Sequence, residues 1–468
     1  MAGPAGPAEA DGAGDAARRT LEDLRAGRLA GARRLHLRGG LREFPREVFQ
    51  LADSLEVLDL TGNALDELPA DFGRLHRLRI LFASDNRFTQ LPDVLGDCPD
   101  LEMVGFKANR IAQVPAAALP ARLRWLILTG NQIAALPPDL GRRPRLQKLM
   151  LAGNRLAALP DTLAACEKLE LIRIAGNRLQ ALPDWLPALP RLAWLAFAGN
   201  PLADAAEAGA LAANPVPDID WSRLAVHERL GEGASGRIHR AIWTDAAGQP
   251  QAVAVKLFKG EVTSDGSPTS EMDACIAAGP HPSLIPVRGR VTGHPQGTPG
   301  LVLGLVDPAW RNLAGSPSLQ SCTRDEYPPG TRLGPGGVVG IAGGVASAVR
   351  QLHARGITHG DLYGHNILWN GDAEALLGDF GAASFSQPAS AQATAVQRVE
   401  ARAFGCLLEE LLAHAGDGMD ASARQTLQAL QVRCAAPTAD TRPGFDEIDD
   451  TLAVLGAAPG RRARVARR

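Results

Sequence analysis

The sequence of 468 residues lacks a dominant charge, a long apolar run and a paired cysteine pattern. Lys and Arg number 49 against 51 Asp and Glu, which gives a net charge of −2 and no chain-wide field that would attract nucleic acid or an anionic membrane. No run of about eighteen apolar residues, as a membrane-spanning helix requires, is present. The six cysteines show neither metal-binding nor redox spacing. We therefore expect a cytoplasmic protein with reduced thiols, no membrane span and no nucleic-acid partner.

Both ends of the chain are expected to lie outside folded domains. Residues 1–19 are rich in Ala, Gly and Pro and lack the basic segment and apolar core of a signal peptide, so we expect a disordered leader. Residues 457–468 form a basic tail, which is expected to be solvated. The length between them exceeds what one hydrophobic core usually holds and predicts two or more domains.

An internal repeat occupies residues 20–203. Its frame is Leu-x-x-Leu-x-Leu-x-x-Asn-x-Leu-x-x-Leu-Pro, and its asparagines recur every 23 residues with one interval of 22, at Asn63, Asn86, Asn109, Asn131, Asn154, Asn177 and Asn200. Residues 35–40 add a degenerate eighth unit at the N-terminal edge. The alternating leucines predict one face of a short parallel strand, and the asparagine can bond backbone groups that the curving chain leaves unpaired. The units are therefore expected to stack into one continuous core.

Residues between the repeated leucines are expected to face away from this core and to line a concave surface. Because neighbouring strands lie about 4.8 Å apart, apolar residues at these positions would form a contiguous exposed patch. This patch comprises Ile80, Phe82, Met103, Trp125, Ile127 and Met150. We interpret it as a docking surface for a protein partner or substrate; the alternative is that loops of the array cover it.

A second group of motifs begins after residues 204–222, where an Ala-rich stretch with two prolines predicts a capping helix and a linker. Gly231, Gly233 and Gly236 form a Gly-x-Gly-x-x-Gly hairpin, in which missing side chains let backbone amides lie over phosphates. The apolar run that ends at Lys256 predicts a buried strand carrying a cation.

The stretch 357–370, ITHGDLYGHNILWN, specifies a reaction. Asp361 and Asn366 are five residues apart in a segment too rich in Gly and His for a regular helix, so a loop can direct both side chains to one point. Asp379 follows between two nearby glycines that allow a sharp turn. Transfer of phosphate from ATP needs a carboxylate that orients the attacking hydroxyl, together with an amide and a carboxylate that hold Mg²⁺. These residues predict a kinase active site.

Two families resemble this chain. The repeat frame resembles the leucine-rich repeat. His359, Asp361, Asn366 and the triplet 379–381 match, position by position, the catalytic loop and the Asp-Phe-Gly motif of protein kinases. The resemblance implies an α/β leucine-rich-repeat solenoid followed by an α+β bilobal protein-kinase-like domain over 223–456, with ATP and Mg²⁺ as cofactors.

The kinase resemblance also implies a role for each motif residue. Asp361 would position the acceptor hydroxyl, Asn366 and Asp379 would hold Mg²⁺, and Lys256 would anchor the phosphates and pair with Glu271. The adenine hinge would run from Gly304 to Val306. The nucleotide-binding positions implied are Gly231, Gly233, Ser235, Gly236, Ile238, Ala254, Lys256, Glu271, Gly304, Val306 and Leu368.

Several positions depart from the kinase pattern. Gly360 stands where most members have Arg, and Tyr363 stands where serine/threonine-specific members usually have Lys. Only eighteen residues separate Gly381 from Glu400, without an Ala-Pro-Glu triplet, so Arg442 lacks its usual Glu partner. Residues 400–405 resemble the start of a helix of the kinase family. The sequence of the insert 307–337 does not indicate a function for it.

We interpret the chain as an ATP-dependent kinase of serine or threonine hydroxyls, with the repeats as a docking domain. The alternatives are a phosphotransferase acting on a small molecule, or a scaffold that binds ATP without turnover. The His-Gly-Asp sequence and Tyr363 favour the first alternative, and the short segment after Gly381 favours both.

Overall fold

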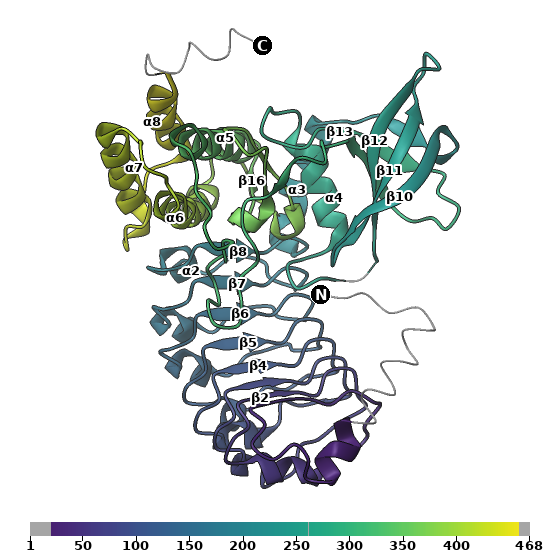
Figure 1. The fold of residues 1–468 in the computed structure, drawn as a ribbon, viewed down its shortest axis with the longest axis vertical. Coiled ribbons are helices and arrows are strands. Elements are labelled where there is room, and N and C mark those ends of the chain that lie inside the picture. Colours follow the sequence, from purple (N-terminus) through teal and green to yellow (C-terminus); the bar gives the residue numbers. More distant parts are fainter. Residues whose placement is uncertain (1–19, 261, 458–468) are drawn as a thin grey trace. The chain divides into compact units, whose positions relative to one another are not determined.

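The computed structural model describes residues 20–260 and 262–457, so the predicted leader and almost all of the predicted tail lie outside the described residues. The chain divides into two compact units between Leu186 and Pro187. Figure 1 shows the helices and strands of each unit.

The first unit is a stack of short parallel strands, one from each repeat (Figure 1). Consecutive strands pair in register, so that Val57 pairs with Ile80 and Ile80 with Met103. The strands are β1 (Arg34–His36), β2 (Val57–Asp59), β3 (Ile80–Phe82), β4 (Met103–Gly105), β5 (Trp125–Ile127), β6 (Lys148–Met150) and β7 (Leu171–Arg173). The return legs are the 3-10 helices η1 (Arg46–Leu51), η2 (Phe72–Arg74), η3 (Asp93–Asp97), η4 (Ala116–Ala118), η5 (Pro138–Arg142) and η6 (Asp161–Ala165), and the short helix α2 (Trp185–Ala188).

The repeated asparagines bond the backbone of two successive repeats, as predicted. Asn131 is 7% exposed, and its amide nitrogen donates to the carbonyl oxygens of Phe106 and Leu128, both at 2.9 Å. Its side-chain oxygen accepts a hydrogen bond from the backbone nitrogen of Ile111 at 2.9 Å. An apolar residue would leave these buried groups unpaired, which explains the strict spacing of the asparagines.

The predicted apolar patch on the concave face is less exposed than its sequence indicates. Met103 and Met150 are only 3% and 7% exposed, so the expectation of exposure is wrong for these two residues. Ile80, Phe82, Trp125 and Ile127 are partly exposed. The Phe82 ring extends over Gly105, where an added Cβ would lie 2.5 Å from its Cδ1. These four partly exposed residues form the concave patch.

The second unit begins with the last repeat and continues into a six-stranded sheet. The last repeat contributes strand β8 (Trp194–Ala196), and the predicted capping helix is α3 (Pro201–Ala213). The sheet has the order β10-β11-β12-β14-β13-β9 and is antiparallel except where β9 joins β13. Its strands are β9 (Asp218–Asp220), β10 (Leu224–Glu232), β11 (Gly236–Thr244), β12 (Pro250–Phe258), β13 (Val287–Thr292) and β14 (Gly300–Gly304), and helix α4 spans Pro268–Ala278.

The remainder of the second unit is mainly helical (Figure 1). Its helices are α5 (Pro335–Ala354), α6 (Ala391–Ala413), α7 (Ala421–Cys434) and α8 (Phe445–Ala457). Two small sheets hold the catalytic segments: β15 (Arg311–Asn312), β17 (Ile367–Trp369) and β18 (Ala375–Leu377) form one, and β16 (Ile357–Thr358) with β19 (Ser384–Phe385) forms the other. No helix within residues 20–260 and 262–457 is long and apolar enough to cross a membrane.

Candidate active site

The catalytic loop brings Asp361 and Asn366 into direct contact. The loop leaves strand β16 and enters strand β17 through the 3-10 helix Gly364–Asn366. The amide nitrogen of Asn366 donates to Asp361 Oδ2 at 2.8 Å and to the Asp361 carbonyl oxygen at 2.9 Å. Both bonds use the amide nitrogen, so they orient the Asn366 side chain and leave its oxygen for another ligand.

His359 ties this loop to the Asp-Phe-Gly segment. It is fully buried, and its Nε2 donates to the carbonyl oxygen of Gly378 at 2.9 Å. Its Nδ1 lies 3.3 Å from the backbone nitrogen of Asp361, which donates to it. Strands β16 and β19 also pair, with Ile357 opposite Phe385. The acid of the loop and the acid of the triplet are thus held within one framework.

Asp379 has a left-handed backbone, with φ 54° and ψ 79°. Such conformations are costly for most residues but accessible to Asp and Asn. The Asp379 side chain accepts a hydrogen bond from the backbone nitrogen of Gly381 at 3.2 Å, and the residue is exposed. The turn therefore presents a carboxylate to solvent at the edge of the site.

The predicted ion pair between Lys256 and Glu271 is present. Lys256 lies on β12 and Glu271 in the first turn of α4, and their side chains are 14% and 1% exposed. Burial alone would lower the pKa of Lys256, but the Glu271 carboxylate and the nearby Asp379 raise the pKa above its ordinary value. Lys256 therefore stays charged beside the acids of the site.

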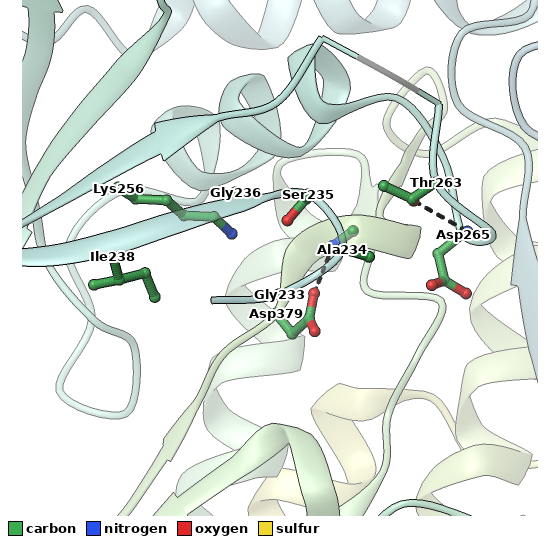
Figure 2. A pocket seen from close by; sticks show the side chains of 10 residues that line it. Gly233, Ala234, Ser235, Gly236, Ile238, Lys256, Thr263, Asp265 and Asp379 are labelled. Carbon is green, nitrogen blue, oxygen red and sulfur yellow. Dashed lines mark hydrogen bonds between the residues drawn. The ribbon is translucent and has the colours of Figure 1, made fainter. Parts of the chain in front are cut away.

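The glycine hairpin between β10 and β11 lines a pocket of about 210 Å³ together with Lys256 and Asp379. Figure 2 shows the side chains of Lys256 and Asp379 around this hairpin. A Cβ on Gly236 would lie 2.6 Å from the carbonyl oxygen of Leu257, so only glycine fits there. Of the predicted nucleotide-binding residues, this pocket brings together Gly233, Ser235, Gly236, Ile238 and Lys256.

A second pocket, of about 100 Å³, lies behind the ion pair and is lined by Ile238, Lys256 and Glu271, with Phe380 and Leu303 among the others. Five other predicted nucleotide positions line neither pocket. Gly231 and Ala254 lie on β10 and β12, Gly304 ends β14, Val306 follows it, and Leu368 lies on β17. Strand pairing brings some of them near the site, since Ala254 pairs with Leu303.

Thr263 and Asp265 also line the first pocket, and sequence reasoning did not find them. They belong to the short spacer between β12 and α4, which turns on itself: Thr263 Oγ1 donates to the carbonyl oxygen of Gly266 at 3.0 Å and accepts from the Asp265 nitrogen at 3.2 Å. This turn, visible in Figure 2, brings a second carboxylate to the pocket that contains Asp379. The motif Thr-x-Asp-Gly in a spacer is too common to have indicated it.

The insert 307–337 braces the catalytic loop. Asp325 has a fully buried side chain that accepts from the backbone nitrogen of His365 at 2.9 Å and from its Nδ1 at 2.7 Å. Burial alone would lower the pKa of His365, but Asp325, Asp361 and Asp379 raise it. Asn312 also donates to the carbonyl oxygen of His365. The insert thus fixes the residue that precedes Asn366.

Glu400 forms a hydrogen bond with the backbone of the catalytic loop. The sequence resemblance predicts a helix start here, but Glu400 lies in the middle of α6, because the short segment after Gly381 runs directly into this helix. Glu400 is 3% exposed and accepts from His353 Nε2 at 2.6 Å and from the backbone nitrogen of Gly360 at 2.8 Å. Burial alone would raise its pKa, but the contacts with His353 and Gly360 lower it.

Phosphorylation of the segment after Gly381 is expected to leave activity unchanged. Ser384 and Ser386 are buried, so only Ser390 and Thr394 remain as accessible hydroxyls. Replacing Ser390 with Asn, which also caps helices, and Thr394 with Ala should keep initial rates within about twofold after phosphatase treatment, because Gly360 offers no cation to a phosphate.

A tenfold loss in this double variant, about 1.4 kcal/mol in the barrier, would contradict that expectation. It would mean that a nearby cation binds a phosphate on the segment. The guanidinium groups of Arg398 and Arg402 are the nearest in sequence, but they already donate to carbonyl oxygens, those of Arg442 and Ala435.

Comparison with known proteins agrees with this geometry. The sequence model described as "Protein tyrosine and serine/threonine kinase" matches residues 224–417, and two leucine-rich-repeat models match residues 54–75 and 144–202. Two serine/threonine-protein kinases of Streptomyces coelicolor, PkaA and PkaB, are 30% and 29% identical to this chain over 176 and 174 residues. Each alignment covers 35% of this chain, and the chain spans 30% and 37% of the length of these relatives.

One solved structure is also similar to part of this chain. A leucine-rich-repeat protein of Leptospira interrogans is 29% identical, and the match covers 38% of this chain and 46% of that one with a TM-score of 0.36. The sequence matches are the stronger observation, since they cover the repeats and the catalytic segments in separate ranges. The chain therefore combines leucine-rich repeats with a protein-kinase domain that follows them.

Proposed function

We propose that this protein kinase uses ATP and Mg²⁺ to phosphorylate serine or threonine hydroxyls. One observation carries the proposal: the hydrogen-bonded pair Asp361–Asn366 and the exposed Asp379 share one framework with the ion pair Lys256–Glu271. This set combines a proton acceptor, two oxygen ligands for a metal and a cation for phosphate. The similarity to the Streptomyces kinases supports a hydroxyl of protein as the acceptor.

The residues fit the two cofactors. Gly233 and Gly236 of the hairpin line the first pocket together with the cationic side chain of Lys256. The side-chain oxygens of Asn366 and Asp379 are hard ligands of the kind that Mg²⁺ prefers. When bound, ATP supplies the phosphoryl group and Mg²⁺ offsets its negative charge.

Each residue of the site has a separate role in this reaction. The Asp361 carboxylate orients the acceptor hydroxyl and accepts its proton, and the Asn366 amide holds that carboxylate in place. Glu271 keeps the Lys256 ammonium extended toward the phosphate pocket. Because these groups are oriented before the substrate arrives, little reorganisation is needed during the reaction.

A radiolabel assay with γ-labelled ATP tests the proposal. Wild type and Asp361→Asn are offered a generic protein substrate, the protein itself and a panel of hydroxyl-bearing metabolites, and labelled residues are identified. Label on serine or threonine that depends on Asp361 supports the proposal. Label on a metabolite alone would instead assign a small-molecule phosphotransferase, and ATP binding without any label would assign a scaffold.

The proposal also covers the cellular location of the protein and the role of its repeats. We propose a reducing compartment such as the cytoplasm, because a chain of this length does not need disulfide bonds and its cysteines are not spaced in pairs. We propose that the concave patch binds a protein partner or substrate, because its partly exposed aromatic and aliphatic residues lie on β3 and β5, on either side of Gly105, which the Phe82 ring overlies.

Phe82→Glu combined with Trp125→Glu should abolish this binding. Both side chains are partly exposed, so the charges enter the concave patch without replacing a repeated leucine, and the melting temperature should change little. The measurement is pull-down of the labelled substrates by each variant, with Arg87→Glu, on the exposed surface after β3, as the charge control. Unchanged capture by the double variant would exclude the patch as the docking surface.

A further inference from the structure

The last repeat belongs to the second unit, which also contains the catalytic loop. Trp194, the first residue of β8, is 1% exposed, and its ring stacks on Tyr363 with centroids 4.3 Å apart and planes inclined by 6°. Its Nε1 donates to the carbonyl oxygen of Leu362 at 3.2 Å. Leu362 and Tyr363 directly follow Asp361, so this tryptophan holds the catalytic loop at the two residues after its acid.

A second contact joins β8 to the segment after the Asp-Phe-Gly triplet. The backbone nitrogen of Phe197 donates to Ser384 Oγ at 2.8 Å. Ser384 lies on β19, which pairs with β16, the strand that leads into the catalytic loop. The repeat therefore bonds both chain segments that carry the acids of the site.

The backbone of β8 also explains the glycine before Asp361. Gly360 has φ 72°, and a Cβ there would lie 2.5 Å from the carbonyl oxygen of Ala382 and 2.7 Å from that of Leu195. Any larger residue would collide with the backbone of the repeat and adopt a strained conformation. The space that a side chain would need at position 360 is filled by the backbone of Ala382 and that of the last repeat.

Two arginines bond the repeat from the helical side. Arg442 is 1% exposed, and its guanidinium donates to the carbonyl oxygens of Pro190 and Arg398, both at 3.1 Å, and of Ala436 at 2.8 Å. Burial, together with the charge of Arg402, lowers the pKa of Arg442 to about 10. Arg402 donates to the carbonyl oxygen of Arg191 at 3.1 Å. Residues 190 and 191 are thus anchored just before β8 begins.

We propose that the last repeat, residues 187–200, positions the catalytic loop, with Trp194 as a positioning residue for Asp361. The proposal rests on the kinase function proposed above and concerns how that activity is regulated. The active arrangement of the catalytic loop requires the folded last repeat, and it does not require a phosphate on the segment after Gly381. A partner that distorts this repeat would change the rate of phosphoryl transfer.

The test compares Trp194→Ala with Trp185→Ala in the full-length protein. Trp185, the first residue of α2, lies nine residues before Trp194, and its Nε1 donates to Asp161. Trp194→Phe is included because it retains the stack on Tyr363 and removes the hydrogen bond to Leu362. For each protein we would measure kcat, KM for ATP, affinity for a fluorescent ATP analogue, melting temperature, and hydrogen exchange of amides 359–366.

The expected result is a tenfold or larger loss of kcat for Trp194→Ala, with nucleotide affinity and KM for ATP within twofold of wild type. Exchange of amides 359–366 should accelerate, Trp194→Phe should be intermediate, and Trp185→Ala should resemble wild type. Ser384→Ala, which removes the acceptor of the Phe197 bond with little loss of volume, should change kcat and exchange in the same direction.

Two results would overturn the inference. One is equal kcat and equal exchange in Trp194→Ala and Trp185→Ala. The other is a parallel loss of nucleotide binding and melting temperature in Trp194→Ala, with Ser384→Ala unchanged in kcat and exchange, which would make Trp194 a general stabilising residue. If wild type transfers no phosphate, the proposed function fails, but the exchange comparison still decides whether the repeat holds the loop.

Discussion

Replacing Asp379 with Asn should reduce kcat by about 10³-fold, because the site would lose a carboxylate that we propose as a ligand of Mg²⁺. This substitution is suited to the position. Asp379 has φ 54°, and Asn is among the few residues that adopt this left-handed conformation readily. The variant should therefore keep the turn and lose only the charge, whereas Ala would also strain the backbone.

Nucleotide binding distinguishes a lost metal ligand from a damaged pocket. The rise in melting temperature that ATP causes in the presence of EDTA should be the same in wild type and Asp379→Asn. The additional rise caused by Mg²⁺ should disappear in the variant, because stabilisation by a ligand follows its affinity for the folded state. Asp372→Asn is the matched control, since it changes an exposed carboxylate in the turn before β18.

Wild-type turnover in Asp379→Asn would remove Asp379 from the metal site. Asp265 would then be the first residue to test, because it lines the same pocket from the spacer before α4. An Asp265→Asn variant that lost the Mg²⁺-dependent stabilisation while Asp379→Asn kept it would assign the metal to the other side of the pocket.

The parts of the fold that depend on local patterns could be predicted from the sequence. Each repeat fixes its strand by alternating leucines and its turn by one asparagine, and the stacking follows from these contacts alone. In the catalytic domain, the pair Asp361–Asn366 arises within five residues, and Lys256 can be identified because it directly follows the small apolar residues 252–255 of β12. Short-range patterns of this kind predict local structure from physical principles alone.

Contacts between distant segments could not be read in the same way. Asp325 supports His365 across 40 residues, and Trp194 bonds Leu362 across 168 residues. In the sequence, Trp194 occupies the same frame position as Trp125, and nothing local distinguishes a tryptophan that is partly exposed from one that stacks on a catalytic loop. The departure at Gly360 was visible, but its causes are the backbone oxygens of Ala382 and Leu195, which only the fold brings near.

Replacing Glu400 with Ala should lower the free energy of unfolding of the second unit by about 2–4 kcal/mol, because two buried donors would lose their acceptor and each unsatisfied buried donor costs about 1–3 kcal/mol. His353, which is 7% exposed, would lose its acceptor, and so would the buried backbone nitrogen of Gly360. Glu409→Ala is the matched control, because Glu409 is an exposed acid of the same helix. Hydrogen exchange of α5 and α6 in increasing urea would measure the loss without signal from the repeats.

The pH dependence provides a sharper check on Glu400. Burial opposes its charge, but the hydrogen bond from His353 and the nearby positive charge outweigh burial and lower the pKa of this carboxyl in the folded state. A depressed pKa contributes stability above the pKa of the unfolded carboxyl, about 4.3, and that contribution is lost as the pH falls through the folded value. The difference in unfolding free energy between wild type and Glu400→Ala should therefore be full at pH 6 to 8 and shrink below about pH 4. A difference that grew on acidification would mean that Glu400 is protonated in the folded protein and donates, rather than accepts, one of its two hydrogen bonds.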